Sequence, residues 1–441
     1  MPNASEAIET SGHASLVNLT ELQKHIAKHE GALHGDEYDP VANPRIMEPL
    51  LLKQSFATEI FDDDLYFDLF GKIACAAPTV IEGLFRVYLD GLLSPRHDLE
   101  VLKVRPLPLE GFETFITRAC GGGKFGVVIN GAEKWSDSLA RLAVELFGPV
   151  AEIQGTNRSM IEVTLFIGNY GYTPFGIHLD DPYTLVVHLH AGPSTKEMTL
   201  FERDKFHSLN GDSTHCFEPS TLVEHGKTYA IEAGDAFLLP PHYYHVGRTD
   251  GYSVGLAFAV SKYSNAVLAK KVLQLAIQER RLIDTYELVV NRSEDEDESL
   301  AEWLVRSNRR YGAKKESLRN LRYPFQRKPL ADVPTDCLWM RDPDFPIAFV
   351  EEPKDLIVYA RGNRIRLSPG ALTRRLVSSV PYEPFTVEQL QRELDGKVSL
   401  PALQAFIREL ALAGGLLFCS DNLDSFELSE IRKASREARF I

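Results

Sequence analysis

The chain has 441 residues, of which 44% are hydrophobic and 25% are charged, a composition typical of a globular protein with more than one domain. Its formal net charge of −14 argues against a general nucleic-acid binder, and no run of about 18 apolar residues predicts a membrane span. Five scattered cysteines without a CxxC pair, and no secretory leader, predict free thiols in a reducing, cytoplasmic compartment.

The first part of the chain carries mainly helical patterns. Residues 1–14 are small and polar and are expected to be disordered. Residues 15–95 are predicted to be mainly helical, and within them residues 74–92 place apolar side chains at helical spacing, with Pro78 at the helix start.

A glycine-rich stretch at residues 121–131 lacks the Lys-Ser or Lys-Thr pair that a phosphate loop needs. It predicts a turn into the strand FGVVI instead. Ser136 is then expected to cap an amphipathic helix that runs to Leu146.

The pattern changes to short strands between about residues 155 and 262. Runs rich in Val, Ile, Leu, Phe and Tyr alternate with turn signals such as Gly234-Asp235 and Pro240-Pro241. Six strands are predicted, near residues 160–167, 183–190, 197–202, 227–232, 236–239 and 252–260. Many short strands separated by turns indicate a sandwich or barrel, and a jelly roll fits this number.

The remainder is helical and then forms a small module. A helical region from residue 264 contains an acidic run at residues 294–298, which is expected to be a solvated loop. The motif at residues 386–389 predicts a capping box, and a second helix follows Ser399 and stops at Gly414 before a strand, LLF.

This order of helix, helix and strand is similar to a winged helix. The second helix carries only Arg408 and Glu409 as charged residues, whereas a DNA-reading helix needs Lys, Arg, Asn or Gln. The module is therefore predicted to serve packing or dimerisation.

The stretch GYTPFGIHLDDPYTLVVHLH, residues 171–190, places His178 and Asp180 two residues apart. On a strand, residues i and i+2 point to the same face, so one imidazole and one carboxylate can reach a single ion. Two histidines and one carboxylate on one face of a metal are typical of an iron(II) site for oxygen chemistry. The third ligand must come from elsewhere, and PPHYYHVG offers His242 and His245.

These motifs resemble the JmjC branch of iron- and 2-oxoglutarate-dependent oxygenases, and the ribosomal oxygenases in particular. The resemblance rests on HLDDPYTLVVHLH, followed by a turn and KEMTLF, and then on GDAFLLPPHYYH. It covers roughly residues 100–420. It implies that His245, rather than His242, completes the site.

The resemblance also implies the roles of the site residues. His178, Asp180 and His245 would hold Fe(II). Lys196 would pair with the distal carboxylate of 2-oxoglutarate, because a buried charge needs such a partner. Thr173 would add a hydroxyl to the same carboxylate.

Two further histidines depart from the family pattern. Alternate residues of a strand lie on one face, so Thr184, Val186, His188 and His190 share a face. Both imidazoles are therefore predicted to line the substrate pocket. Tyr243 is also placed in this pocket, because the pair Tyr243-Tyr244 is expected to face the core with one ring and the pocket with the other.

Together these features predict an α+β protein with a double-stranded β-helix (jelly-roll, cupin or JmjC) core. The expected divisions are an N-terminal tail and helical region, the catalytic jelly roll, a helical dimerisation region and a winged-helix-like domain, at residues 1–95, 96–263, 264–335 and 336–441.

The predicted activity is an Fe(II)- and 2-oxoglutarate-dependent dioxygenase that hydroxylates a peptide, protein or amino-acid side chain. Expected partners are a ribosomal protein or a natural-product precursor peptide and a second copy of the chain, but no nucleic acid and no membrane. Two alternatives remain: a cupin-type metalloenzyme without 2-oxoglutarate, in which Lys196 lies on the surface, and a non-catalytic winged-helix regulatory or scaffold protein.

Overall fold

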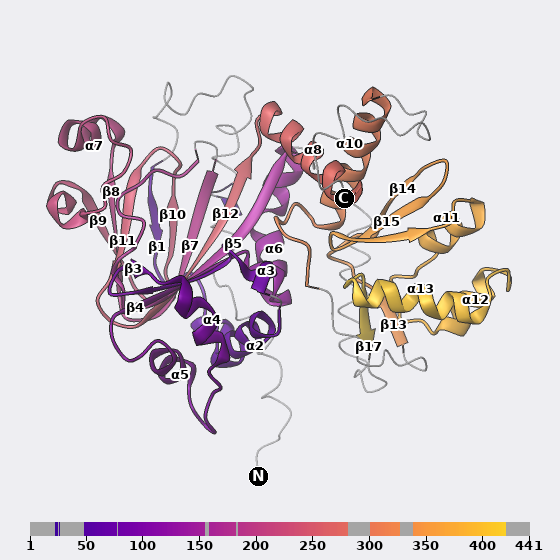
Figure 1. Ribbon diagram of the computed structural model, residues 1–441, viewed down its shortest axis with the longest axis horizontal. Coiled ribbons are helices and arrows are strands. Elements are labelled where there is room, and N and C mark those ends of the chain that lie inside the picture. The colour runs from indigo at the N-terminus through magenta and orange to yellow at the C-terminus, as the bar shows by residue number, and fades with distance from the viewer. Residues whose placement is uncertain are drawn as a thin grey trace, which may run out of the picture. The chain divides into compact units, whose positions relative to one another are not determined.

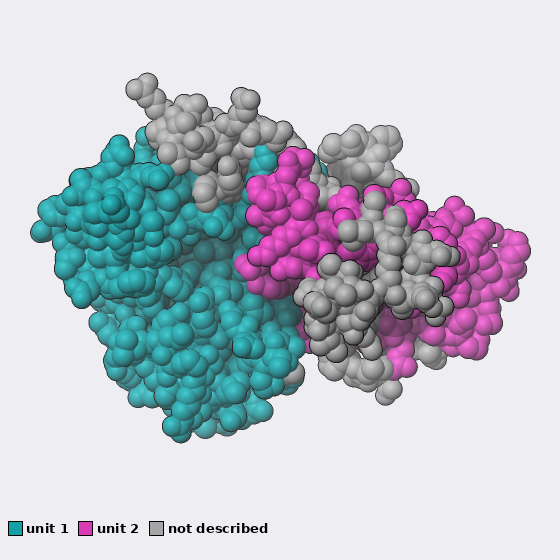
Figure 2. All heavy atoms as spheres, turned by 45° about the horizontal axis from the view of Figure 1, so that its top comes forward, with its two compact units in different colours: residues 1–155, 159–262 teal, residues 156–158, 263–441 magenta. Residues whose placement is uncertain are grey.

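The computed structural model describes residues 23, 24, 26, 48–76, 78–154, 158–181, 184–280, 300–326 and 338–419 (Figure 1). The chain divides into two compact units, shown in separate colours in Figure 2. Unit 1 comprises residues 1–155 and 159–262, and unit 2 comprises residues 156–158 and 263–441. The predicted tail at residues 1–14 and the acidic run at residues 294–298 lie outside the described residues.

Unit 1 is built on two antiparallel sheets. The larger has the order β1 (Leu50–Leu52), β10 (Ala236–Leu239), β7 (Thr184–Pro193), β12 (Ser253–Lys262), β5 (Ser159–Gly168), β4 (Phe125–Asn130), β2 (Phe85–Leu89) and β3 (Leu92–Leu93). The smaller has the order β6 (Gly171–Tyr172), β11 (Tyr244–Thr249), β8 (Lys196–Phe201) and β9 (Lys227–Ile231).

The two sheets enclose a shared apolar interior. It contains buried side chains from β7, β10 and β12 of the larger sheet together with side chains from β8 and β9 of the smaller one: Val186, Met198, Leu200, Ile231, Phe237, Leu239 and Ala257. We call this set the interior cluster. Two antiparallel sheets with a common core are the arrangement expected of a jelly roll.

The six strands predicted between residues 155 and 262 are all present, as β5, β7, β8, β9, β10 and β12, and FGVVI lies in β4. Strand β11 was not predicted. Its residues YHVGRT contain a glycine and three charged or polar side chains, His245, Arg248 and Thr249, so no apolar run marks it. It forms because it pairs with β8 on one side and β6 on the other.

The helical prediction for residues 74–92 is wrong beyond its first turn. Pro78 does begin a helix, but α3 ends at Ile81 and the chain then forms β2. Phe85 and Val87 are almost fully buried where β2 pairs with β4, and a helix could not make this pairing. Tertiary pairing therefore overrides the local pattern.

Residues 15–95 are thus only partly helical where they are described. Their helices are η2 (Thr58–Ile60), α2 (Asp63–Ala74), α3 (Pro78–Ile81) and the start of α4 (Pro95–Lys103). The other helices of unit 1 are α5 (Phe112–Ala119), η3 (Ala132–Lys134), α6 (Asp137–Gln154), α7 (Arg203–Asn210), η4 (Pro219–Thr221) and η5 (Val223–His225).

Helix α6 packs against β5 and β12. The predicted cap is confirmed, because the Ser136 hydroxyl accepts a hydrogen bond from the Leu139 amide at 3.3 Å. The helix is longer than expected and continues through Pro149.

Unit 2 begins with α8 (Asn265–Arg280) and α10 (Leu300–Ser317). A three-stranded sheet of β14 (Ala348–Glu351), β15 (Leu356–Ala360) and β16 (Asn363–Leu367) follows, with α11 (Ala371–Ser378), α12 (Val387–Glu393) and α13 (Leu400–Leu412). A two-stranded sheet pairs β13 (Leu338–Arg341) with β17 (Leu416–Cys419).

The local predictions for this unit hold. Thr386 and Gln389 form the capping box of α12. Helix α13 begins after Ser399 and buries Leu403, Phe406, Ile407 and Leu410, and LLF opens β17. The sheet of β14, β15 and β16 was not predicted.

No helix among the described residues is long and apolar enough to span a membrane. The four cysteines within the described ranges, Cys75, Cys120, Cys216 and Cys419, carry free thiols.

Candidate metal centre

His178 and His245 lie opposite each other on neighbouring extended segments. The two residues form an antiparallel bridge, in which the His178 amide donates to the His245 carbonyl at 3.1 Å and the His245 amide donates back at 2.8 Å. Their ring centroids are 4.4 Å apart. The pairing of β11 with the segment after β6 therefore brings together histidines 67 positions apart (245 − 178).

Both imidazoles are oriented by their own backbone. Nδ1 of His178 lies 3.1 Å from the Gly176 carbonyl, and Nδ1 of His245 lies 3.2 Å from the Tyr243 carbonyl. Since a carbonyl can only accept, each Nδ1 carries the hydrogen and each Nε2 keeps its lone pair for a metal.

Gly176 makes this turn possible. Its φ is +68°, and a Cβ there would lie 2.2 Å from the Cys216 carbonyl oxygen, so no other residue fits without moving the loop.

Asp180 completes the group. Its Oδ1 lies 3.8 Å from His178 Nε2 and its Oδ2 lies 3.9 Å from His245 Nε2. One ligand atom from each of the three residues lies within 4.8 Å of the others. His178 and Asp180 remain partly exposed, so the group has an open side. Two imidazole nitrogens and one carboxylate oxygen with open positions suit Fe(II).

Burial lowers the pKa of His178 to about 4, with a further contribution from His245, while Asp180 acts in the opposite direction. The neutral imidazole is the form that binds a metal ion.

Lys196 opens β8 and points into the interior. Its exposed fraction is 2%, and burial lowers the pKa of its ammonium to about 8. The ammonium lies 4.9 Å from the centroid of the Phe166 ring. Among the residues that the structure describes, no carboxylate forms an ion pair with it. A buried cation without an anion indicates a site for an anionic ligand.

Thr173 lies beside Lys196. Its amide donates to the Gly247 carbonyl at 2.7 Å, while its buried hydroxyl has no hydrogen-bond partner within the described part of the chain. A Cβ on Gly247 would lie 3.1 Å from Lys196 Cε and 3.3 Å from Thr173 Cγ2. The Lys196 ammonium would lie 3.8 Å from the same Cβ, so the end of the lysine side chain and the Thr173 side chain border one space, which the absence of a side chain at Gly247 leaves open.

This space adjoins the metal-binding group. Gly247 is two residues after His245 on β11, so the two positions share a strand face and lie about 7 Å apart. A ligand that bridges the Lys196 ammonium and a metal at His245 must span roughly that distance.

His188 and His190 are both buried and lie on the same face of β7 as Val186 of the interior cluster, and their place in a substrate pocket stays a prediction. Neither ring nitrogen of His188 has a hydrogen-bond partner among the residues that the structure describes. Burial, followed by the charges of Lys196 and His245, lowers its pKa well below the usual value. His190 instead contacts the Ser194 carbonyl through Nε2 at 2.7 Å.

Tyr243 packs against the interior cluster, and its hydroxyl donates to Glu48 Oε2 at 3.4 Å. Burial and the neighbouring acids Glu48 and Glu202 raise the pKa of Tyr243 to about 12. Tyr244 points the other way and stacks on Phe206 at 3.9 Å. The two rings therefore pack against different clusters, and the placement of Tyr243 in a substrate pocket stays a prediction.

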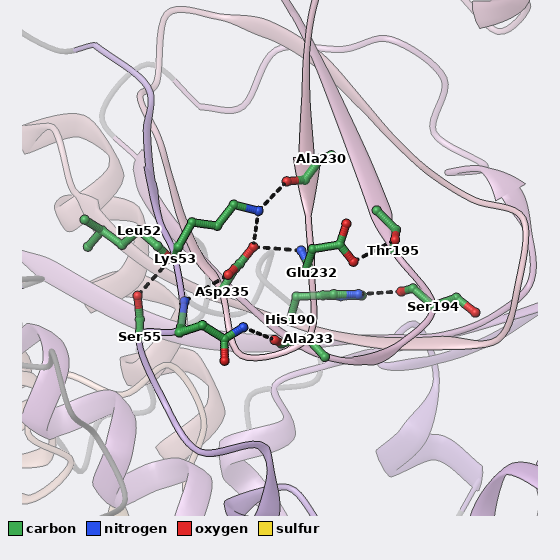
Figure 3. Close-up of polar contacts among 11 residues, drawn as sticks. Leu52, Lys53, Ser55, His190, Ser194, Thr195, Ala230, Glu232, Ala233 and Asp235 are labelled. Carbon is green, nitrogen blue, oxygen red and sulfur yellow. Dashed lines mark hydrogen bonds and ion pairs between the residues drawn. The ribbon is translucent and has the colours of Figure 1, made fainter.

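Asp235 has a role that the sequence did not reveal, although its Gly-Asp motif marked a turn. Its fully buried carboxylate accepts from Lys53 Nζ at 2.7 Å, from the Gln54 amide at 2.9 Å and from the Glu232 amide at 2.8 Å (Figure 3). It thereby joins the segment after β1 to the turn between β9 and β10. Its backbone carbonyl accepts from the His190 amide at 3.1 Å.

Replacing Asp235 by asparagine is expected to destabilise the protein by about 2–4 kcal/mol, because one acceptor of a charge-assisted network becomes a donor facing other donors. The free energy of unfolding in urea measures this. Asp250→Asn is the control, because Asp250 forms an exposed pair with Arg248 and should cost less than about 1 kcal/mol. Equal effects of the two changes would show that the Asp235 network is not stabilising.

No family model and no curated protein sequence matches the chain. The chain is similar to solved structures of a ribosomal oxygenase from Escherichia coli, YcfD. The structure of YcfD with cobalt and succinic acid is 16% identical in sequence to this chain. It has a TM-score of 0.42, and the match covers 87% of this chain and 98% of that one. The structure of YcfD with cobalt and 2-oxoglutarate is 15% identical, with a TM-score of 0.41 and the same coverage of both chains.

A further match is SnoN, a non-heme α-ketoglutarate-dependent epimerase from nogalamycin biosynthesis, with 11% identity, a TM-score of 0.24, and coverage of 42% of this chain and 84% of that one.

Proposed function

We propose that the protein is an Fe(II)- and 2-oxoglutarate-dependent dioxygenase that hydroxylates a peptide, protein or amino-acid side chain. The observation that carries the proposal is the convergence of His178, Asp180 and His245, whose ligand atoms lie within 4.8 Å of one another. Two imidazoles with free Nε2 lone pairs and one carboxylate form the donor set that iron(II) oxygenases use.

The residues present also fit the co-substrate. The Lys196 ammonium and the Thr173 hydroxyl are buried and lack an anionic partner among the described residues, and the side chains of both residues border the space over Gly247. They would hold the distal carboxylate of 2-oxoglutarate, with its 2-oxo acid end towards His178, Asp180 and His245.

When bound, Fe(II) with O2 and 2-oxoglutarate supplies the oxidation: one oxygen atom enters succinate as CO2 leaves, and the other enters a C–H bond of the substrate. The chain supplies orientation and exclusion of water. Lys196 and Thr173 fix one end of the co-substrate, the metal-binding group fixes the other, and the interior cluster keeps water away.

The substrate is proposed to be a peptide or protein, such as a ribosomal protein or a natural-product precursor peptide. His188 and Tyr243 would line its pocket, because both face the interior next to the metal-binding group. For unit 2 we propose a winged-helix-like module at residues 336–441 that, with the helical region before it, supports a homodimer in the cytoplasm.

The cupin alternative without 2-oxoglutarate places Lys196 on the surface, whereas its exposed fraction is 2%. That alternative also makes His188 or His190 a metal ligand, but the group of possible ligands within the described ranges contains only His178, Asp180 and His245. Both observations favour the dioxygenase.

The test is anaerobic addition of Fe(II) and 2-oxoglutarate, followed by the visible metal-to-ketoacid charge-transfer band. The wild type should show the band, while His245→Ala and Lys196→Ala should lose it at the same ligand concentrations. A wild-type protein that binds Fe(II) but shows no band would overturn the proposal in favour of the cupin alternative.

The affinity for 2-oxoglutarate is expected to fall as the pH rises through about 8. The pKa of Lys196 is lowered to about 8, so the ammonium is present below this pH and is lost above it. His188 and His190 face the same space but are neutral throughout this range, because burial lowers the pKa of each. The dissociation constant should rise by up to about tenfold per pH unit above 8.

Calorimetric titration of the Mn(II)-loaded protein between pH 7 and 9.5 measures this. Lys196→Arg is the matched control, because a guanidinium keeps its charge across the range and should give a flat profile. The same slope in both proteins would assign the titration to another group.

A further inference from the structure

His190 is held from three directions. Its amide donates to the Asp235 carbonyl at 3.1 Å, and its own carbonyl accepts from the Gly234 amide at 2.9 Å. Its ring contacts the Ser194 carbonyl through Nε2 at 2.7 Å, as Figure 3 shows. The buried Asp235 network therefore fixes the backbone of His190, and Ser194 fixes its imidazole.

The contact with Ser194 determines the tautomer. A carbonyl oxygen can only accept, so Nε2 carries the hydrogen, and in the neutral ring Nδ1 presents a bare lone pair. This Nδ1 is buried, and no described residue donates a hydrogen bond to it. An unsatisfied buried acceptor is costly, so a donor is expected at this position.

Lys196 is the donor within reach. His190 pairs with Gly255 in the register of β7 and β12. A Cβ on Gly255 would lie 3.2 Å from Lys196 Nζ and 3.9 Å from His190 Nδ1. The ammonium and the lone pair thus both lie within 4 Å of the position that a Cβ of residue 255 would occupy, and this position is open because residue 255 is a glycine.

The lone pair on Nδ1 also excludes His190 from binding a carboxylate directly. Two acceptors repel each other, so His190 in this tautomer cannot bind the distal carboxylate of an acid, whereas an ammonium hydrogen complements it. His188 differs, because neither of its ring nitrogens has a partner among the described residues and none of those residues fixes its tautomer.

We propose that His190 is a positioning residue that accepts a hydrogen bond from the Lys196 ammonium through Nδ1 and holds this cation in the space beside Gly255. The other ammonium hydrogens then bind the distal carboxylate of the 2-oxo acid. The inference rests on the proposed function and assigns to His190 a role other than contact with the substrate.

Three variants separate this role from a structural one. His190→Asn places an amide oxygen near the position of Nδ1 and loses the contact with Ser194. His190→Gln places its amide near the position of Nε2, so it can reach Ser194 but offers no acceptor to Lys196. His190→Phe keeps the ring volume and removes both contacts.

The measurement is the affinity of the Mn(II)-loaded full-length protein for 2-oxoglutarate, with Mn(II) affinity as the control. His190→Phe and His190→Gln should weaken 2-oxoglutarate binding about tenfold, while His190→Asn stays within about threefold of the wild type. Mn(II) affinity should not change. Wild-type affinity in His190→Gln with a loss in His190→Asn would overturn the proposal and assign His190 to the turn alone.

A second measurement needs no ligand. Urea unfolding compares His190→Phe, Lys196→Met and the double variant with the wild type. If the two side chains are in contact, the double variant should be more stable than the sum of the two single effects predicts, by at least about fivefold in the unfolding constant. Additive effects would overturn the contact. Failure of the wild type to bind 2-oxoglutarate would instead overturn the proposed function, and the cycle would still decide whether His190 holds Lys196.

Discussion

Replacing His178, Asp180 or His245 by alanine is expected to weaken divalent metal binding by more than about 100-fold and to abolish the coupled turnover of 2-oxoglutarate. Loss of a residue that only orients a ligand already costs about 10- to 100-fold in metal affinity, and each of these changes removes a ligand itself. Titration with Fe(II) or Mn(II) under anaerobic conditions, together with succinate production in air, measures both effects.

His242→Ala is the matched control. His242 lies three residues before His245, but among the described residues it is not part of the group whose ligand atoms converge. Its metal affinity should equal that of the wild type. Two results would show that the third ligand is wrongly assigned. One is strong metal binding by His245→Ala, and the other is a loss of metal affinity in His242→Ala as large as the loss expected for His245→Ala. Thermal unfolding of the metal-free variants checks that each one folds.

Replacing Lys196 by methionine is expected to weaken 2-oxoglutarate binding about 10- to 100-fold while leaving the affinity for the metal unchanged. The variant keeps most of the buried aliphatic volume but loses a charge-assisted contact, which contributes roughly 1.5–3 kcal/mol. Calorimetry on the Mn(II)-loaded protein separates the two affinities.

Lys227→Met is the control for Lys196→Met, because Lys227 is an exposed lysine on β9 of the same sheet and should tolerate the change. Gly255→Ala tests the same space from the opposite strand, since its Cβ would lie 3.2 Å from Lys196 Nζ and would displace the ammonium. Undiminished 2-oxoglutarate binding in both Lys196→Met and Gly255→Ala would place the co-substrate elsewhere.

Much of the site could be predicted from local sequence. The spacing of His178 and Asp180 marks two possible ligands, although the predicted strand face is absent: His178 forms an isolated bridge and Asp180 lies outside any strand. The resemblance of GDAFLLPPHYYH to the oxygenase motifs singles out His245 over His242. The capping box at Thr386 and the apolar face of α13 are equally local, because both depend on residues within a few positions of one another.

The features that the sequence did not predict share one physical cause. Strands β2 and β11 form because distant segments supply their hydrogen-bonding partners, and neither the helical spacing of residues 74–92 nor the polar run of β11 reveals those partners. The roles of Asp235 and of the lone pair on His190 depend in the same way on groups that only the folded sheets bring close.

The sequence by itself determined which residue types could hold a metal and where most strands of the jelly roll run, because these depend on spacing along the chain. Only the tertiary structure decided that His178 and His245 pair across two segments, that Lys196 is buried without a carboxylate partner among the described residues, and that glycines at 247 and 255 leave room for its ammonium. These features arise from the packing of two sheets against each other, and no local pattern encodes that geometry.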